Sequence, residues 1–536
     1  MLDQLGQSFQ VILSYITFTE TFKLSFIQQY SNLVYKNAGV ALKLQANSLP
    51  KNLERPQVLF LINLVRLSKG LVSLDLTTIQ LNQEDALLLI DSLKNTQCHF
   101  DSLKLFTKHL LLYPFEQAFR ICSIRRITLA QNSFESGNLK NIFKELNHWK
   151  TTSLCLEGNK IGDKGAEIIS HGLCNSKIEF LNLSNNSIGD RGVELLSKCL
   201  PCSKVSHLEI QTNFAYRNKL ISDKGAKAIA QVLPECPLES LVFKGNSVRS
   251  VASICSSLPL SKLSCLNLGD NKIGNQGAED LAKVLPVCQL KYLDIGNNQI
   301  GSSGCIALGK AIKHSQLVSL KLYDNSALTE GAEAIAEGLA GSLVQSLDLA
   351  SNSIGDSGIE HLSRTLSSSC LVSLNLKSNS ITKQGISFLV TSLATSSLQA
   401  LDLSCNFVEE GVQLVADQLS GTSLSCLKLT RNRISEEGGK ALGEVLSFSR
   451  LSTLKLSNNK IGTVGAKAIA FSLPDSQLHK LEINANQIQD EGGRYFVEKI
   501  PSSKLKSLKL RDKTLTQETN QAISNLCSRN NIRLIT

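Results

Sequence analysis

Leucines and other apolar residues recur in the pattern L-x-x-L-x-L-x-x-N-x-I-G-x-x-G-A, as at Leu181, Leu183, Asn186, Ile188 and Gly192. Side chains of an L-x-L stretch alternate between two faces, which predicts a short strand with its leucines turned inward. After the Gly-Ala pair the apolar positions follow the helical period, as over 165–173, which predicts an amphipathic helix. Each unit is therefore predicted to be a strand, a turn, a helix and a turn.

The Asn of this pattern sets the repeat length. Ten of its thirteen steps are 27 residues long, and it stands at 132, 159, 186, 213, 246, 271, 298, 325, 352, 379, 406, 432, 459 and 486. A buried turn leaves backbone groups unpaired, and an Asn amide can donate to and accept from them. We therefore interpret these residues as a structural ladder. Weaker copies extend the pattern; the last has Lys513 at the ladder position.

Acidic residues stand where the predicted helices begin. Asp163, Asp190, Asp223 and Asp356 each precede a Gly by two residues. A carboxylate at a helix start accepts unpaired N–H groups and lies favourably against the helix dipole. We expect each of them to cap the helix that it begins.

One unit cannot bury its leucines alone, so neighbouring units must stack, with parallel strands in one layer and helices in the other. Helices are wider than the strand spacing of about 4.8 Å, so the stack should curve with its strands inside. We predict an α/β solenoid, a horseshoe with a concave parallel sheet and convex helices. About eighteen repeats would form a single solenoid over residues 39–536, with the last unit as C-terminal cap and residues 1–38 as a helical N-terminal cap.

The motif and its length resemble the leucine-rich repeat family, specifically its ribonuclease-inhibitor-like class. The resemblance implies a non-catalytic scaffold that binds a protein partner on its concave face. Members that activate small GTPases suggest one alternative function, although the Ran regulator has an acidic C-terminal tail where residues 504–513 of this chain are basic. Bacterial members suggest another alternative, an effector delivered into a host cell.

Charge and cysteine content limit the classes of partner and the cellular compartment that we expect. The chain has 56 Lys and Arg against 46 Asp and Glu, a net charge of +10 over 536 residues, and no run of like charges, so we expect no specific nucleic-acid partner. Its 15 cysteines are scattered without a framework, and we find neither a signal peptide nor an apolar stretch long enough to span a membrane. We expect a cytoplasmic monomer.

No motif for catalysis is found. The chain has no GxxxxGK[ST], HExxH or GxSxG sequence, and its eight histidines follow no common phase. We therefore expect no enzyme activity, no cofactor and no metal. Cys199 and Cys202 form a C-x-x-C pair, which redox or zinc sites use, but they stand at the end of a predicted helix without a second pair. We interpret them as structural.

Strand alternation selects the residues that should face outward from the sheet, which are those six, four and two positions before each ladder Asn. The side chains on this face have mixed, mildly acidic charge in the middle of the chain and are basic towards the C-terminus. The predicted partner-binding residues are Tyr292, Asp294, Lys321, Tyr323, Asp348, Lys377, Asp402, Lys428 and Lys455. Tyr292 and Tyr323 are the proposed aromatic anchors, because exposed aromatics often contribute much of a binding energy. An insertion over 214–219 is a second candidate surface, with Phe214, Tyr216 and Arg217.

Overall fold

The computed structural model describes residues 146–212 and 221–535 continuously and, before them, 42–44, 72–76, 84, 87–89, 91, 100–105, 124–132, 134, 139–140 and 143. The predicted cap over 1–38 lies outside the described residues, as does the insertion. Two compact units are distinguished, one up to residue 248 with 260–263, and one of residues 249–259 with 264–536. The prediction of one solenoid over 39–536 stays a prediction.

The first unit is a parallel sheet with helices packed on one face. Successive strands pair in register, so that Leu154 lies beside Leu181 and Leu181 beside Leu208. Its strands are β1 (Leu42–Leu44), β2 (Val72–Leu76), β3 (Phe100–Leu105), β4 (Ile124–Thr128), β5 (Ser153–Cys155), β6 (Phe180–Asn182), β7 (His207–Glu209) and β8 (Ser240–Val242). The 3₁₀ turn η2 (Leu146–His148) precedes its helices α7 (Gly162–Leu173), α8 (Asp190–Cys199) and α9 (Asp223–Val232).

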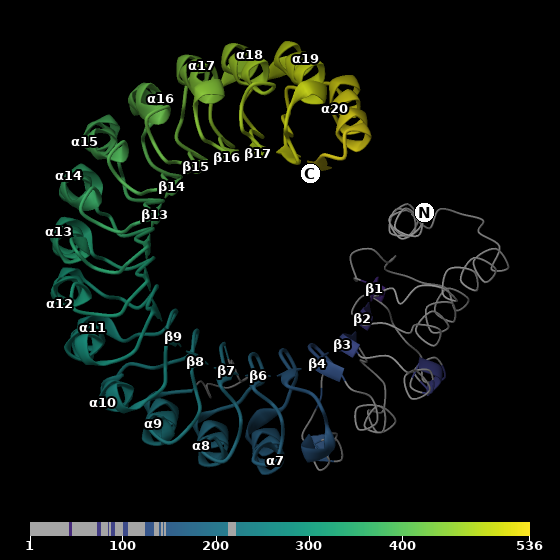
Figure 1. Ribbon diagram of the computed structural model, residues 1–536, viewed down its shortest axis with the longest axis vertical. Helices are drawn as coiled ribbons and strands as arrows, with labels where there is room; N and C mark the ends of the chain where they lie inside the picture. Colours follow the sequence, from purple (N-terminus) through teal and green to yellow (C-terminus); the bar gives the residue numbers. More distant parts are fainter. Residues whose placement is uncertain are drawn as a thin grey trace, which may run out of the picture. The chain divides into compact units, whose positions relative to one another are not determined.

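The second unit repeats this arrangement, with its strands along the inner side and its helices outside (Figure 1). Its strands are β9 (Cys265–Asn267), β10 (Tyr292–Asp294), β11 (Ser319–Lys321), β12 (Ser346–Asp348), β13 (Ser373–Asn375), β14 (Ala400–Asp402), β15 (Cys426–Lys428), β16 (Thr453–Lys455), β17 (Lys480–Glu482), β18 (Ser507–Lys509) and β19 (Arg533–Leu534). Every neighbouring pair from β9 to β19 is parallel.

The helices of the second unit each follow one strand of the sheet, apart from α10, which precedes β9. They are α10 (Ala252–Ser257), α11 (Gly274–Val284), α12 (Ser302–Ile312), α13 (Leu328–Leu339), α14 (Gly355–Leu366), α15 (Lys383–Leu393), α16 (Val412–Leu419), α17 (Glu436–Val445), α18 (Gly462–Ser472), α19 (Gln489–Lys499) and α20 (Gln517–Arg529). Short 3₁₀ turns are η3 (Leu258–Leu260), η4 (Leu285–Val287), η5 (Glu409–Gly411), η6 (Leu446–Phe448) and η7 (Ile500–Ser502). The predicted alternation of strand and helix is confirmed.

The core lies between sheet and helices. The central leucines of neighbouring strands, such as Leu320, Leu347 and Leu374, are almost completely buried and stack in one row. Burying one such side chain stabilises the fold by about 1.5–3 kcal/mol. Because every unit contributes the same leucines, the units stabilise one another as the pattern predicts.

The ladder Asn residues perform the structural role expected of them. Asn379 accepts from the backbone N–H of Asn352 at 2.9 Å and donates to the carbonyl of Leu349 at 2.8 Å, both in the preceding unit. Its neighbours Ser378 and Ser380 have φ angles of 57° and 59°, so the turn cannot pair its backbone as a regular strand would. The side-chain amide supplies those missing bonds.

The last rung of this ladder differs from its prediction. The Oδ2 atom of Asp512, rather than Lys513, accepts from the backbone N–H of Asn486 at 2.6 Å. A lysine has no acceptor atom, so it cannot take an Asn position. The assignment of Lys513 to the ladder is therefore wrong by one residue.

The acids at the helix starts are hydrogen-bond acceptors, but for a different helix. Asp163 Oδ1 accepts from the N–H groups of Gly189 and Gly192 at 2.7 and 3.0 Å, at the start of α8 rather than of its own helix α7. Asp356 in α14 accepts from Thr382 N at 2.8 Å, before α15. The expectation of self-capping is wrong for both, because each carboxylate bridges to the next unit.

One cysteine pairing was not apparent from the spacing. Cys174, after α7, and Cys202, after α8, form a disulfide between adjacent units. Cys202 therefore bonds to Cys174 and not to Cys199, its partner in the C-x-x-C motif. Burial raises the pKa of the Cys199 thiol to about 12, which leaves little of the reactive thiolate at neutral pH.

Candidate functional site

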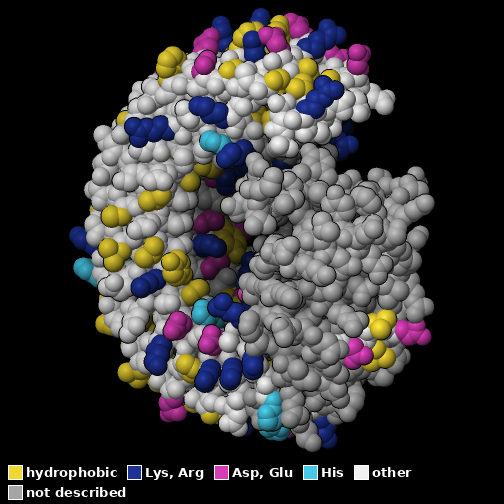
Figure 2. Space-filling view, turned by 45° about the vertical axis from the view of Figure 1, so that its right-hand side comes forward, with side chains coloured by type: hydrophobic (Ala, Val, Ile, Leu, Met, Phe, Trp, Pro, Cys, Tyr) yellow, Lys and Arg dark blue, Asp and Glu magenta, His cyan; other side chains and the backbone are white. Residues whose placement is uncertain are grey.

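The candidate site is the outward face of the sheet in the second unit, from β9 to β19. Side chains six, four and two positions before each ladder Asn project from this face, as strand alternation requires. The space-filling view shows basic and acidic side chains intermingled along the inner side (Figure 2). The nine residues predicted on strands all lie on the outward face of β10–β16 or of the turns that follow these strands.

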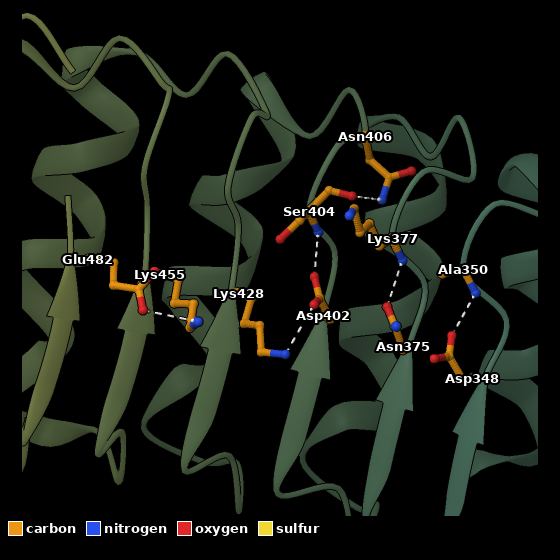
Figure 3. Close-up of polar contacts among 10 residues, drawn as sticks. All are labelled: Asp348, Ala350, Asn375, Lys377, Asp402, Ser404, Asn406, Lys428, Lys455 and Glu482. Carbon is orange, nitrogen blue, oxygen red and sulfur yellow. Dashed lines mark hydrogen bonds and ion pairs between the residues drawn. The ribbon is translucent and has the colours of Figure 1, made fainter. Parts of the chain in front are cut away.

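Short polar side chains at the four-before position fold back onto their own backbone. Asp348 Oδ1 accepts from Ala350 N at 3.0 Å, and Asp402 Oδ1 accepts from Ser404 N at 2.9 Å. Asn375 makes the same bond to the N–H of Lys377 at 3.1 Å (Figure 3). These side chains close the end of each strand, so part of their hydrogen-bonding capacity is used within the unit.

Ion pairs then connect neighbouring strands. Lys321 Nζ lies 3.7 Å from Asp294 Oδ2, and Lys428 Nζ lies 3.2 Å from Asp402 Oδ2. The contact of Lys428 with Asp402 and that of Lys455 with Glu482 cross from one strand to the next in Figure 3. Partly exposed pairs of this kind stabilise a fold by less than about 1 kcal/mol each. They therefore orient the side chains of this face and add little to the stability of the fold.

Asp294 is the most buried of the predicted partner-binding residues. It is 9% exposed and accepts from Gly296 N at 3.1 Å and from the Asn267 amide at 3.2 Å. Gly296 N donates to Oδ1, whereas Lys321 shares Oδ2 with the Asn267 amide, so both oxygens of the carboxylate face donors of this chain. Asp294 therefore supports its neighbours rather than offering a free charge.

The two predicted aromatic anchors differ in their surroundings. Tyr292 is 50% exposed. Tyr323 lies across Gly296, where a Cβ atom would overlap its ring, and its Oη lies 3.1 Å from the Cβ position of Gly269. Glycines in the two preceding units thus form a cradle for Tyr323. The sequence carries a signal for this cradle, because glycine takes an outward strand-end position at both sites.

Basic side chains dominate the C-terminal part of this face. Glu482 Oε1 is contacted by both Lys455 Nζ and Lys480 Nζ, each at 3.0 Å. Partial burial acts to raise the pKa of Glu482, but hydrogen bonds from Lys480 and Lys455 outweigh it, so the pKa is lowered. This carboxylate therefore stays ionised at neutral pH and holds two lysines in place.

A metal site, a membrane-spanning helix and the insertion are the remaining candidate features. Within the described ranges, no cluster of three or more His, Cys, Asp or Glu side chains is placed to hold a metal ion. No helix among the described residues is both long and apolar enough to cross a bilayer. The insertion candidates Phe214, Tyr216 and Arg217 lie outside the described residues.

Comparison with solved structures returns matches of low sequence identity. An internalin from Listeria monocytogenes is 19% identical, with 73% of this chain and 88% of that chain covered and a TM-score of 0.38. A chain of the yeast Rad7 and Elc1 complex is 17% identical, with coverages of 75% and 88% and a TM-score of 0.44. No curated protein matches the chain.

A family model gives the assignment. The leucine-rich repeat model matches nine segments, which are residues 152–170, 174–197, 260–282, 288–309, 342–363, 367–390, 422–443, 451–470 and 476–497. The matches fall in both compact units, and each covers parts of the repeat that the structure shows as strand, turn and helix. These nine segments match leucine-rich repeats and together make up less than half of the chain.

Proposed function

We propose that this protein is a non-catalytic scaffold that binds a protein partner on the outward face of its parallel sheet. The observation that carries the proposal is the composition of that face in the second unit. Half-exposed Tyr292 on β10 and exposed Lys321 on β11 lie on this face, and exposed Lys377 follows β13 beside acids held by backbone bonds. Aromatic side chains within a polar surround are typical of protein interfaces.

The geometry also supports the finer class that the repeat length suggests. Most units of the second half pair a three-residue strand with a full α-helix, as β12 does with α14. We therefore propose the ribonuclease-inhibitor-like class of leucine-rich repeats, in which each repeat contains an α-helix. An experimental structure with short turns in place of these α-helices would contradict the assignment to this class.

Site-specific photo-crosslinking tests the binding face. A photoreactive phenylalanine analogue would replace Tyr292 or Lys377 in the full chain, expressed in its native cells. The matched control carries the same analogue at Phe448, which is 74% exposed in η6 and lies outside the sheet. We expect a discrete protein adduct from the two sheet positions and none of that mass from Phe448.

Two outcomes of the crosslinking experiment would contradict binding on the sheet face. An adduct that forms from Phe448 alone, or no discrete adduct from either sheet position, would remove the sheet face as the binding surface. Circular dichroism of each variant verifies that the substituted chain has folded.

We also propose a monomer in a reducing compartment, the cytoplasm. Eleven of the described cysteines are free, and most of these are buried, as small apolar residues are. Cys370 is free and exposed and tests the location. Alkylation in intact cells before lysis, followed by mass spectrometry, should find the Cys370 thiol modified if the compartment is reducing; a Cys370 found only in a mixed disulfide would contradict it. Light scattering of the purified chain measures the oligomeric state, and a dimer mass would contradict a monomer.

A further inference from the structure

Five cations lie together on the last four strands of the sheet, and we call them the basic strip. The strand register places Lys455 beside Glu482 and Glu482 beside Lys509 in one row. The next row holds Lys480 beside Ser507, and Ser507 beside Arg533. Arg511 follows β18 on the same face. The basic strip is Lys455, Lys480, Lys509, Arg511 and Arg533.

The charge of this strip is not balanced by carboxylates among the described residues. Glu482 is shared by Lys455 and Lys480, so one carboxylate serves two lysines. Lys509, Arg511 and Arg533 have no carboxylate within ion-pair distance among the described residues. Arg511 and Arg533 are also exposed, and Lys509 is half-buried. Against these five cations stand Glu482 in the strip and Asp512 beside Arg511, so the strip still has an excess positive charge that an acidic ligand would neutralise.

A cavity adjoins the strip. It has a volume of about 960 Å³ and contains Arg511 in its lining, so that the cavity and the strip share one side chain. Apolar Leu510, which directly follows β18, lines it together with Ile523 of α20 and Leu534 of β19. Its carboxylate, Asp512, is already engaged, because Oδ2 accepts from Asn486 N and Oδ1 accepts from Thr514 N and Oγ1.

We propose that the basic strip and this cavity bind an acidic segment of a partner protein, with its carboxylates on the strip and one apolar side chain in the cavity. This rests on the proposed scaffold function and names the chemistry of the partner. Neighbouring strands are about 4.8 Å apart, and every second residue of an extended peptide advances by about 6.6 Å. A segment that crosses the strands therefore brings its carboxylates within reach of successive cations.

The side chains around the strip favour an acidic protein over a nucleic acid. Single-stranded nucleic acids bind where bases stack on aromatic side chains beside the cations. The outward residues of β15–β18 are Cys, Lys, Thr, Ser, Glu, Asn and Arg, and the residues that line the cavity also contain no aromatic. The cavity instead offers the aliphatic surface that a leucine or valine of a peptide would contact.

Fluorescence anisotropy with labelled peptides tests the proposal on the full chain. The probe is a fluorescein-labelled decamer of glutamate, and the variant is Lys509→Glu with Arg511→Glu. The matched control is Lys310→Glu with Lys313→Glu, which changes the net charge equally at exposed positions in and just after α12. We expect the strip variant to bind about tenfold more weakly or worse, and the control to stay within about twofold of the unmodified chain.

A second probe examines the cavity. Eight glutamates with a leucine at each end should bind about threefold more tightly than the decamer if an apolar side chain enters the cavity. Equal affinity of the two peptides would overturn the role of the cavity. Both variants should unfold at the same temperature as the unmodified chain, because none of the four substituted cations is ion-paired among the described residues.

The remaining outcomes separate this proposal from the scaffold function. No binding of the glutamate decamer, or equal losses in strip and control variants, would overturn the acidic partner. Tighter binding of a twenty-nucleotide thymidine oligomer, lost in the strip variant alone, would overturn it in favour of nucleic acid. Crosslinking from Tyr292 that persists in any of these cases would leave the scaffold function standing.

Discussion

The outward face of the second unit contains two regions that use one repeat position differently. From β10 to β14 the four-before position holds Asp294, Asp348, Asn375 and Asp402, each bonded to the backbone N–H two residues later, with Lys321 on β11 as the exception. From β15 to β18 the same position holds lysines, except for Glu482. The strands themselves pair in the same register throughout. The backbone is thus constant while the role of the position changes.

Side-chain length and hydrogen-bond polarity explain this difference. An Asp or Asn oxygen lies close enough to the main chain to accept from the second following N–H group. A lysine has only donors on a long stem, so it cannot make this bond and extends into solvent. Acids in the first region are therefore partly structural. In the second region Lys428, Lys455 and Lys480 are ion-paired, whereas Lys509, which has no carboxylate partner among the described residues, can meet a ligand. Charge on such a face should be counted only after its internal bonds are assigned.

The largest effect should follow the removal of Asp294. The substitution Asp294→Ala leaves Gly296 N, the Asn267 amide and Lys321 without this acceptor. We expect the free energy of unfolding to fall by about 2 kcal/mol, since leaving buried donors unpaired is costly. Urea denaturation followed by circular dichroism measures it. Lys509→Ala in the basic strip should change stability by no more than about 0.5 kcal/mol.

A conservative variant sharpens this test. Asp294→Asn keeps an oxygen for Gly296 N but loses the charge that faces Lys321, so it should recover more than half of the lost stability. If Asp294→Ala were as stable as the unmodified chain yet lost partner binding, Asp294 would belong with the ligand-contacting residues and the division between the two regions would fail.

An intermediate effect concerns the cradle of Tyr323. A methyl group at Gly296 would overlap the ring, so Gly296→Ala should displace Tyr323 towards solvent at a cost of about 1 kcal/mol. Nitration by tetranitromethane, quantified by mass spectrometry, should increase at Tyr323. Tyr292 is already 50% exposed and provides the internal control. Unchanged nitration at Tyr323 would contradict the cradle.

Sequence periodicity predicted the fold because one pattern is repeated in each unit. The inward leucines and the ladder Asn residues obey constraints that hold wherever two units stack, and the structure confirms them. The partners of polar side chains were harder to predict. Asp163 caps the helix of the next unit, and Asp294 contacts Asn267 and Lys321 on the neighbouring strands. Both sets of contacts depend on how adjacent units are offset in space. A linear pattern specifies which face a residue occupies but not which neighbour reaches it.

The same limit applies to the ends of the pattern. Asp512 replaces the ladder Asn one residue early because a carboxylate in a slightly shortened turn still reaches Asn486 N. Counting 27 residues from Asn486 led to Lys513, which cannot accept that bond. Periodicity fails where a turn changes length, and hydrogen-bond polarity is then the better guide.

The smallest expected effect is a pH-dependent loss of stability when Glu482 in the second region is substituted. Hydrogen bonds from Lys480 and Lys455 lower the pKa of Glu482 below its ordinary value of 4.5. A carboxyl group whose pKa is lower in the folded state contributes stability above its unfolded pKa and loses that contribution as the pH falls through the folded pKa. Glu482→Gln should therefore be less stable than the unmodified chain at pH 7 by less than about 1 kcal/mol, and the difference should shrink as the pH falls below 4.5. Urea midpoints measured for both chains across this range provide the test. A difference that persisted at low pH would mean that Glu482 acts through packing, and the lysines beside it would then need no carboxylate to hold them in the strip.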